Sequence, residues 1–184
     1  MSIKFGRHGF TPREAVAAVA SVLALSGILS RPYSPDPTHP RLRRWYKHLD
    51  KSALTPPDAV FGGVWQVLLS ALGYGTYRLL RLLRLLRLLR RPPTPQRNTA
   101  VALSAATVGL VTLYSKITFE NRDLTGGTRE SAVLVATAAA YVAVAAQTDT
   151  TAAALGAPLA LWSSFGGWLT HDLARRNPGL DAGA

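Results

Sequence analysis

Residues 59–77 read AVFGGVWQVLLSALGYGTY, and no charged side chain interrupts this stretch. A helix that crosses the hydrocarbon core of a bilayer needs about 20 apolar residues, with a range of roughly 17 to 25. A soluble helix of this length would carry polar residues along one face at helical spacing. Here small and apolar residues occupy every face of the helix. The stretch therefore predicts a transmembrane helix.

Four further windows lack charged residues in the same way, at residues 15–30, 98–115, 131–148 and 150–170. Each is long enough, alone or with its flanks, for a membrane-spanning helix. The chain has 184 residues, a length that suits one small helical membrane bundle. We therefore predict an all-α membrane protein, a five-transmembrane-helix bundle in a single domain over 1–184, with helices at about 12–30, 57–80, 98–117, 130–148 and 150–172.

The charged residues lie between these windows. The formal net charge is +11, and Cys is absent. Basic residues beside apolar spans are the usual anchors of membrane proteins, so we expect a lipid bilayer rather than nucleic acid as the partner. The absence of Cys excludes disulfides, thiolate metal sites and a cysteine nucleophile. We expect an integral, multi-pass protein of a bacterial cell membrane.

The first span has an alternative interpretation. Lys4, Arg7 and Arg13, followed by AVAAVASVLALSGIL at 15–29, also match the basic and apolar regions of a cleaved signal peptide. No cleavage site of the Ala-x-Ala type follows them, which favours a retained helix.

A repetitive tract, YRLLRLLRLLRLLRR, occupies residues 77–91. Five of its six arginines, at about 2.5–3.5 kcal/mol each, already outweigh eight leucines at roughly 0.3–0.6 kcal/mol each, so the tract cannot cross a membrane. Its three-residue period turns the arginines by about 60° at each repeat, which prevents a fixed amphipathic face. We predict a basic Arg-Leu segment over 78–91 that extends the second span along the headgroups, and a polar, frayed tail over 173–184.

Small residues recur at helix-packing spacing in the third span. Helices in lipid associate through close packing of such residues. One interpretation is packing inside the bundle, and the other is a homodimer through span three, by way of Ala102, Ala105, Ala106 and Gly109.

Three blocks of sequence carry a specific resemblance. They are WYKHLDKSALTPPDAVFGGVWQVLLSALGY at 45–74, TLYSKITFENR at 112–122 and APLALWSSFGGWLT at 157–170. In this order they resemble the signature of the TspO/MBR family, which comprises the translocator proteins, or peripheral benzodiazepine receptors, and the bacterial tryptophan-rich sensory proteins. The resemblance covers the chain from about 45 to 175 and implies five transmembrane helices.

The resemblance also implies a ligand and a site. Family members bind tetrapyrroles such as haem and protoporphyrin, and in animals sterol-like molecules, in a pocket beneath the loop between helices one and two. Carried over residue by residue, the pocket takes loop residues, wall residues from three spans and one small position near the ligand: Trp45 and Tyr46, Phe61 and Trp65, Tyr114, Trp162 and Phe165, and Gly166.

Elementary chemistry agrees with this site. A porphyrin is a flat apolar ring with two carboxylates, so it needs aromatic surface, an apolar cavity and cations near its mouth. Haem or protoporphyrin is thus expected as a ligand, and no cofactor is required. The cations are available in the loop before the second span, as Arg41, Arg43, Arg44, Lys47 and Lys51.

The chain also departs from the family pattern. Val111 and Thr170 stand where the family usually has Asn, and Gly63 replaces a proline of the second helix. The chain has four tryptophans. The resemblance therefore implies a pocket with fewer aromatic faces and fewer amide groups.

Two other functions remain open at this point. Some bacterial members of the family degrade protoporphyrin in light, so a light- or oxygen-dependent porphyrin-degrading enzyme is one alternative. A small-molecule transporter is the other, although such proteins usually keep charged residues inside the membrane and the five windows contain none. No residue pattern for hydrolysis or a metal site is evident, so we assign no catalytic and no metal-binding residue. A carrier, buffering or stress-sensing role is the leading hypothesis.

Overall fold

The structure of the protein is a computed structural model that describes residues 10–35, 37–88 and 94–183. Within these residues the regular structure is helical and contains no strand. Six α-helices alternate with a π-helical turn, η2, and two short 3-10 turns, η1 and η3. Their bounds in chain order are α1 Pro12–Ser30, η1 Arg31–Tyr33, α2 Pro40–His48, α3 Asp58–Leu88, α4 Pro95–Ser115, η2 Lys116–Glu120, α5 Leu124–Ala146, α6 Thr150–Arg176 and η3 Pro178–Leu180.

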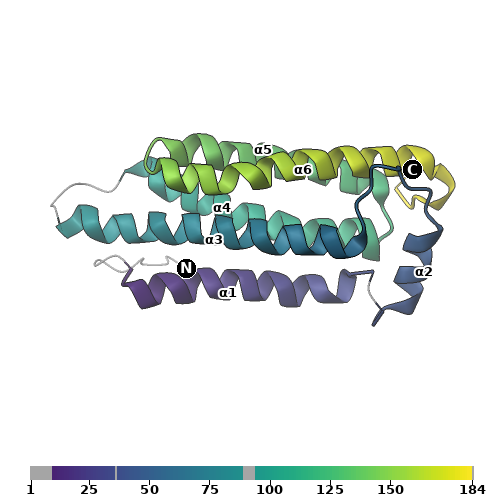
Figure 1. Cartoon of the computed structure of the whole chain (residues 1–184), viewed down its shortest axis with the longest axis horizontal. Helices are drawn as coiled ribbons and strands as arrows, with labels where there is room; N and C mark the ends of the chain where they lie inside the picture. The colour runs from purple at the N-terminus through teal and green to yellow at the C-terminus, as the bar shows by residue number, and fades with distance from the viewer. Residues whose placement is uncertain (1–9, 36, 89–93, 184) are drawn as a thin grey trace.

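Five long helices form an elongated bundle, and the short α2 lies across one end of it (Figure 1). Around the bundle, α1 packs against α3 and α4, α3 packs against α6, and α5 packs against α4 and α6. We call the end that carries α2 and η2 the α2 end. The opposite end, which carries the connection between α5 and α6 at residues 147–149, is the turn end.

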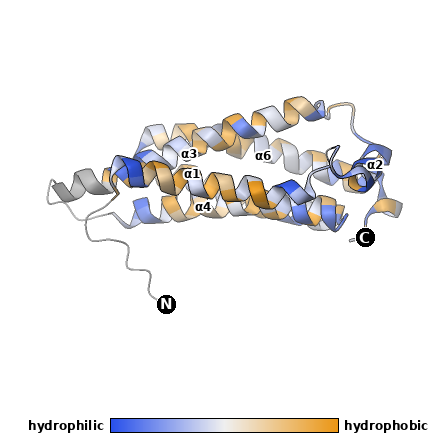
Figure 2. Ribbon diagram, turned by 90° about the horizontal axis from the view of Figure 1, so that it is seen from below, coloured by the Kyte–Doolittle hydropathy of each residue, from blue (hydrophilic) through white to orange (hydrophobic). Residues whose placement is uncertain are grey.

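Four of the long helices, α1, α3, α4 and α5, are long and apolar enough to cross a membrane. Figure 2 shows apolar residues along the lengths of the helices, with hydrophilic residues gathered toward the two ends. α6, with 27 residues, is not among these four. The all-α membrane fold is therefore confirmed, whereas the predicted number of five crossing helices is not.

Two helices extend beyond their predicted bounds. α5 begins at Leu124 instead of about residue 130, since the side chain of Asp123 caps its first turn by accepting from the Gly126 amide. α3 continues to Leu88 instead of ending near residue 80. The first part of the Arg-Leu tract is therefore a continuation of α3, and residues 89–91 of the tract lie outside the described residues.

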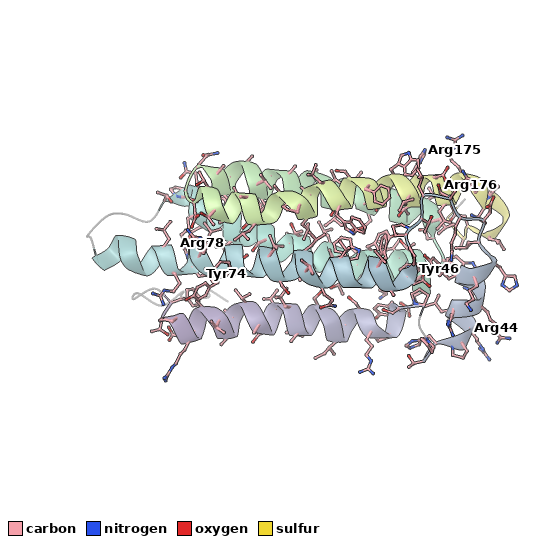
Figure 3. The ribbon with its side chains drawn as sticks, viewed as in Figure 1. Arg44, Tyr46, Tyr74, Arg78, Arg175 and Arg176 are labelled. Atoms are coloured by element: carbon pink, nitrogen blue, oxygen red, sulfur yellow. The ribbon has the colours of Figure 1, made fainter. Side chains whose placement is uncertain are left out.

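Two arginines fasten the turn end. Arg78, the first arginine of the tract, donates from Nε and Nη2 to the two carboxylate oxygens of Asp149, at 3.0 and 3.2 Å. Asp149 also caps α6, because its Oδ1 accepts from the Ala152 amide at 3.0 Å. The buried Arg97 of α4 donates from Nε to the Leu79 carbonyl oxygen at 2.9 Å. Figure 3 shows Arg78 at this end, close to Tyr74.

Near the turn end, three helices pack around Tyr141 of α5, whose exposed fraction is 1%. Its hydroxyl donates to the Ala152 carbonyl oxygen of α6 at 3.2 Å. Gly75 of α3 and Gly156 of α6 leave the space that the ring occupies, because a side chain at either position would overlap Tyr141. Small residues thus bring three helices into contact around one aromatic ring.

The segment after α6 is held in place, in contrast to the frayed tail predicted over 173–184. Asn177 is buried, and its side chain exchanges hydrogen bonds with the backbone of Asp50, accepting from N at 2.8 Å and donating to O at 2.9 Å. Asp181 accepts from the backbone amides of Leu124 and Thr125 at 2.7 and 3.1 Å. The tail therefore clasps both the loop before α3 and the start of α5.

Candidate functional site

A cavity of about 800 Å³ lies inside the bundle, toward its α2 end. Residues from α1, α3, α4, η2, α5 and α6 line it, together with nine residues of the segment that joins α1 to α3, among them Arg43, Tyr46 and Lys51. Pockets for drug-sized ligands usually measure roughly 300–1,000 Å³ and are mostly apolar. The cavity is therefore large enough for an organic ligand of that class.

Five of the residues predicted for the site line this cavity. Tyr46 lines it from α2, Phe61 and Trp65 from α3, Tyr114 from α4, and Gly166 from α6. Gly166 has no other group within 4 Å of the position that a Cβ would take, so it leaves open space in the wall. The chain thus brings five positions from four helices to one space.

The other three predicted residues stand outside the lining. Trp162 and Phe165 of α6 form a second row, since the Trp162 ring lies 5.5 Å from the ring of Phe61 and 5.5 Å from that of Phe165. Trp45 lies outside the cavity on α2, where the guanidinium carbon of Arg122 is 5.8 Å from its ring centroid. These residues support the wall or the loop rather than face the space.

Phe119 was missed by the sequence analysis, although it lines the cavity. It lies in η2 between the rings of Tyr46 and Tyr114, with centroid distances of 5.5 and 5.9 Å and edge-to-face geometry in both pairs. η2 is a π-helical turn, a local irregularity often found at functional sites. A helical sequence pattern assumes regular spacing along the whole helix. A π-helical turn inserts one extra residue and so changes which side chains face the cavity, which the pattern does not show.

Charged groups concentrate where the loop meets the cavity. Arg31, Arg43, Lys51 and Asp58 belong to the lining. The Lys51 Nζ lies 3.5 Å from the centroid of the Tyr46 ring, an arrangement that attracts the ammonium to the ring face. Burial lowers the pKa of Lys51, and the charge of Asp58 opposes this shift. Burial and the charge of Asp58 together raise the pKa of the Tyr46 phenol.

The wall between α4 and α6 is polar at one point. The hydroxyls of Tyr114 and Thr170 lie 2.8 Å apart. Thr170 donates its proton to the Gly166 carbonyl oxygen at 2.9 Å, so it accepts from Tyr114. Val111 and Thr170, which replace the family's Asn residues, both line the cavity. The amide groups expected at these positions are therefore replaced by one hydroxyl pair and one apolar side chain.

The sequence analysis also gave no site residue in α1. Leu23, Ser26, Gly27 and Ser30 nevertheless line the cavity, and the Ser26 hydroxyl lies 2.7 Å from that of Thr112 in α4. The apolar window of α1 contains no aromatic or charged signal that distinguishes these positions from lipid-facing ones.

One further buried group, Glu130 of α5, escaped the sequence analysis because the charge-free window begins one residue later. Its exposed fraction is 6%, and neither carboxyl oxygen has a hydrogen-bond partner among the described residues. In the same described part of the chain, no three His, Asp or Glu side chains gather as a metal site would require. The aromatic and aliphatic side chains of the cavity lining suit an apolar molecule.

Comparison with known proteins adds two findings. The model of the TspO/MBR family matches residues 15–175. The chain is also similar to the translocator protein of Homo sapiens, at 32% identity over 141 residues that cover 76% of this chain and 79% of the human protein. The matched range contains all eight predicted site residues and the whole cavity wall.

Proposed function

The chain belongs to the TspO/MBR family, and we propose on this premise that it binds tetrapyrroles such as haem or protoporphyrin, or related sterol-like molecules, in the cavity at its α2 end. It is an integral, multi-pass membrane protein. In this proposal the protein carries or buffers its ligand, or senses its level under stress. A bacterial cell membrane as its location is part of the same proposal.

The observation that carries the proposal is the composition of the cavity wall. The aromatic side chains of Phe61, Trp65 and Tyr114 line a space of about 800 Å³. Flat aromatic ligands gain from offset or edge-to-face contact with such rings, by about 0.5–1.5 kcal/mol for a ring pair beyond the burial of area. A second row, formed by Trp162 and Phe165, fixes the orientation of Phe61.

The position of the cations supports a ligand that bears carboxylates. Arg43 and Lys51 line the α2 end of the cavity, and Figure 3 shows further arginines, among them Arg44, Arg175 and Arg176, gathered at the same end of the molecule. A carboxylate beside Lys51 would relieve the cost of its burial, because an opposite charge favours the charged form of a lysine. The ligand would then lie with its apolar ring among the aromatic residues and its carboxylates toward the loop.

We further propose that α6 crosses the membrane as the fifth span. It runs alongside α5 over most of the length of the bundle (Figure 1) and packs against α3 and α5. Its polar residues include Ser163 and Thr170, which are buried against the neighbouring helices instead of facing lipid. A helix whose polar groups point inward tolerates a lower mean hydropathy than one that stands alone in lipid.

The proposal is tested by titrating the purified protein with protoporphyrin, following both tryptophan quenching and the absorbance of the porphyrin. Trp65→Ala removes a ring from the cavity wall, and we expect at least about a tenfold loss of affinity, equivalent to about 1.4 kcal/mol. Trp162→Ala acts through Phe61 and should cause a smaller loss. Trp168→Ala is the matched control, because Trp168 is exposed on α6 and does not line the cavity.

An equal affinity in all four proteins would contradict the assignment of the cavity. An absence of saturable binding by the wild type would contradict tetrapyrrole binding itself. The absorbance measurement is needed because each substitution also removes a fluorophore.

A further inference from the structure

Glu130 occupies an unusual position for a carboxyl group. It lies in the first third of α5, one of the helices apolar enough to cross a membrane. Only 6% of its surface is exposed, and both carboxyl oxygens lack a hydrogen-bond partner among the described residues. Ionisable residues inside membrane segments are costly and usually have a function. The groups around Glu130 therefore decide whether its side chain can be charged.

Its surroundings are polar, and no Lys, Arg or His of the described residues donates a hydrogen bond to it. The hydroxyl of Tyr114 in α4 is close enough for the two groups to interact electrostatically. Gly127, one turn before Glu130, lies against Thr118 of η2 and Thr170 of α6. The hydroxyl of Thr118 is fully buried and also lacks a hydrogen-bond partner within the described residues.

The other ionisable groups at this end of the packed elements do not neutralise it. Asp172 of α6 pairs with Arg176 at 2.6 Å, and Arg129, the neighbour of Glu130 on α5, is exposed. The remaining ionisable groups on η2 and α6 are solvent-exposed, namely Lys116, Glu120, His171 and Arg175. An ionised carboxylate at position 130 would therefore be a buried charge without a counter-ion, which is strongly unfavourable.

Protonation of the Glu130 carboxylate removes this unpaired charge. Tyr114 donates to Thr170, so the phenol oxygen keeps its lone pairs as acceptors. A carboxylate only accepts hydrogen bonds, whereas a neutral carboxylic acid also donates one. The proton of the Tyr114 hydroxyl is already donated to Thr170 and is not available to a carboxylate. The neutral acid is therefore the form of Glu130 that suits this wall.

Tyr114 also connects Glu130 to the cavity. It lines the cavity itself, and its ring is followed by Phe119 and Tyr46, over which the Lys51 ammonium lies. Glu130 is therefore at the same end of the bundle as the cations that would hold the carboxylates of a ligand. A negative charge on Glu130 would oppose those carboxylates across a wall of low dielectric constant.

We propose that Glu130 is a buried proton-binding site and that its proton couples ligand binding in the cavity to pH. The neutral acid form accepts an anionic ligand, and release of the proton weakens its binding. The second part of this inference rests on the proposed function, whereas the proton site itself does not.

The proton is tested by infrared spectroscopy of the full-length protein in lipid, without ligand. The expected result is a carboxylic acid carbonyl band at neutral pH that is lost in Glu130→Gln and disappears as the pH is raised. Glu120→Gln is the matched control, because it removes the same charge from an exposed position ten residues earlier and should leave the band unchanged. A band that is missing at every pH, or that is unchanged in Glu130→Gln, overturns the proton site.

The coupling is tested by protoporphyrin affinity as a function of pH in the same three proteins. We expect the wild type and Glu120→Gln to lose about tenfold in affinity at alkaline pH relative to Glu130→Gln, because only the latter stays neutral. Lys51 and the porphyrin carboxylates titrate equally in all three, so the difference isolates Glu130. Superimposable profiles overturn the coupling while leaving ligand binding intact. A wild type that binds no porphyrin contradicts the proposed function instead, and the infrared result then decides the proton site alone.

Discussion

Arg78 and Asp149 are joined by two parallel hydrogen bonds, of 3.0 and 3.2 Å, although 71 residues separate them in the sequence. The pair fastens α3 to the first turn of α6, which Asp149 also caps. Paired N–H donors from an arginine fix geometry as well as charge. The first arginine of the Arg-Leu tract is therefore a structural residue of the bundle.

Substitution of Asp149 should separate its two roles. Asn at a helix N-cap is nearly as good as Asp, so Asp149→Asn removes the ion pair and keeps the cap, whereas Asp149→Ala removes both. We expect Asp149→Ala to be less stable than Asp149→Asn by about 1 kcal/mol, measured by unfolding in detergent. Asp172→Asn, which breaks an i,i+4 surface pair, should change stability by only about 0.3–0.5 kcal/mol. Equal stability of the two Asp149 variants would argue against the cap.

The same pair predicts a loss of stability in acid. Burial alone would raise the pKa of Asp149, but hydrogen bonds from Arg78 and from the backbone of α6 hold the pKa below its ordinary value. The stabilisation is therefore complete above the unfolded-state pKa, about 3.9, and is lost as the pH falls through the lower pKa of the folded state. The stability difference between the wild type and Asp149→Asn should be constant from about pH 7 to pH 5 and should shrink below about pH 4. A difference that persists undiminished at still lower pH would contradict this account.

Two glycines of α6 should respond in opposite ways to alanine. A methyl group at Gly156 would overlap the ring of Tyr141, and such overpacking costs about 1–3 kcal/mol. Gly166→Ala meets no neighbouring atom within 4 Å, so it should leave the melting temperature unchanged or slightly higher. Because Gly166 lines the cavity, its methyl group should instead weaken protoporphyrin binding. Thermal unfolding together with a ligand titration distinguishes the two effects, and a destabilised Gly166→Ala would show that the open space is not real.

Loss of the clasp at Asn177 should loosen the loop before α3. Asn177→Ala removes the two hydrogen bonds to the Asp50 backbone and a third to the Leu173 carbonyl oxygen. Each buried polar group left unpaired costs about 1–3 kcal/mol. Hydrogen exchange at residues 49–57 should become faster, with a smaller change in α5. Asn121→Ala, at an exposed position, is the control, and unchanged exchange in the loop would show that the clasp is dispensable.

The homodimer through span three remains a proposal with a clear test. Ala102, Ala105, Ala106 and Gly109 are all exposed on α4, so these four positions are not used for packing inside the bundle. Ala106→Trp should convert a wild-type dimer to a monomer in detergent, as measured by light scattering, because a large side chain prevents the close approach of two helices. Ala143→Trp, on an exposed face of α5, should remain dimeric. A wild type that is monomeric in lipid discs as well would rule out this interface.

The charge-free windows predicted the membrane class, and the family resemblance predicted five of the residues that line the cavity. Charge-free windows mark helices that lie in lipid, and the motif around Tyr46, Phe61 and Trp65 marks the wall that α2 and α3 provide. Tyr114 and Gly166 were found in the same way. Each of these residues belongs to a short sequence motif that can be recognised without knowledge of the fold. The cavity wall forms when the bundle brings these motifs side by side.

What the sequence did not predict depends on contacts between distant segments. The burial of Glu130 and the clasp made by Asn177 each require a partner far away in the chain, and the π-helical turn that places Phe119 is a local irregularity. Trp45 was predicted as a loop residue over the pocket, and Trp162 and Phe165 as residues of the fifth span at the pocket. All three stand beside or behind the lining. The sequence motifs do not indicate which face of each helix points into the bundle.

The short connection between α5 and α6 has a consequence for how the protein is made. Only residues 147–149 separate the two helices, and α5 is long and apolar enough to cross a membrane. On the proposal that α6 is the fifth span, a connection this short brings the two helices into the membrane as a paired hairpin. Lengthening the connection with a polar linker should then lower the fraction of α6 that inserts while α5 stays inserted. In this proposal, biogenesis depends on the tight turn as much as the finished fold does.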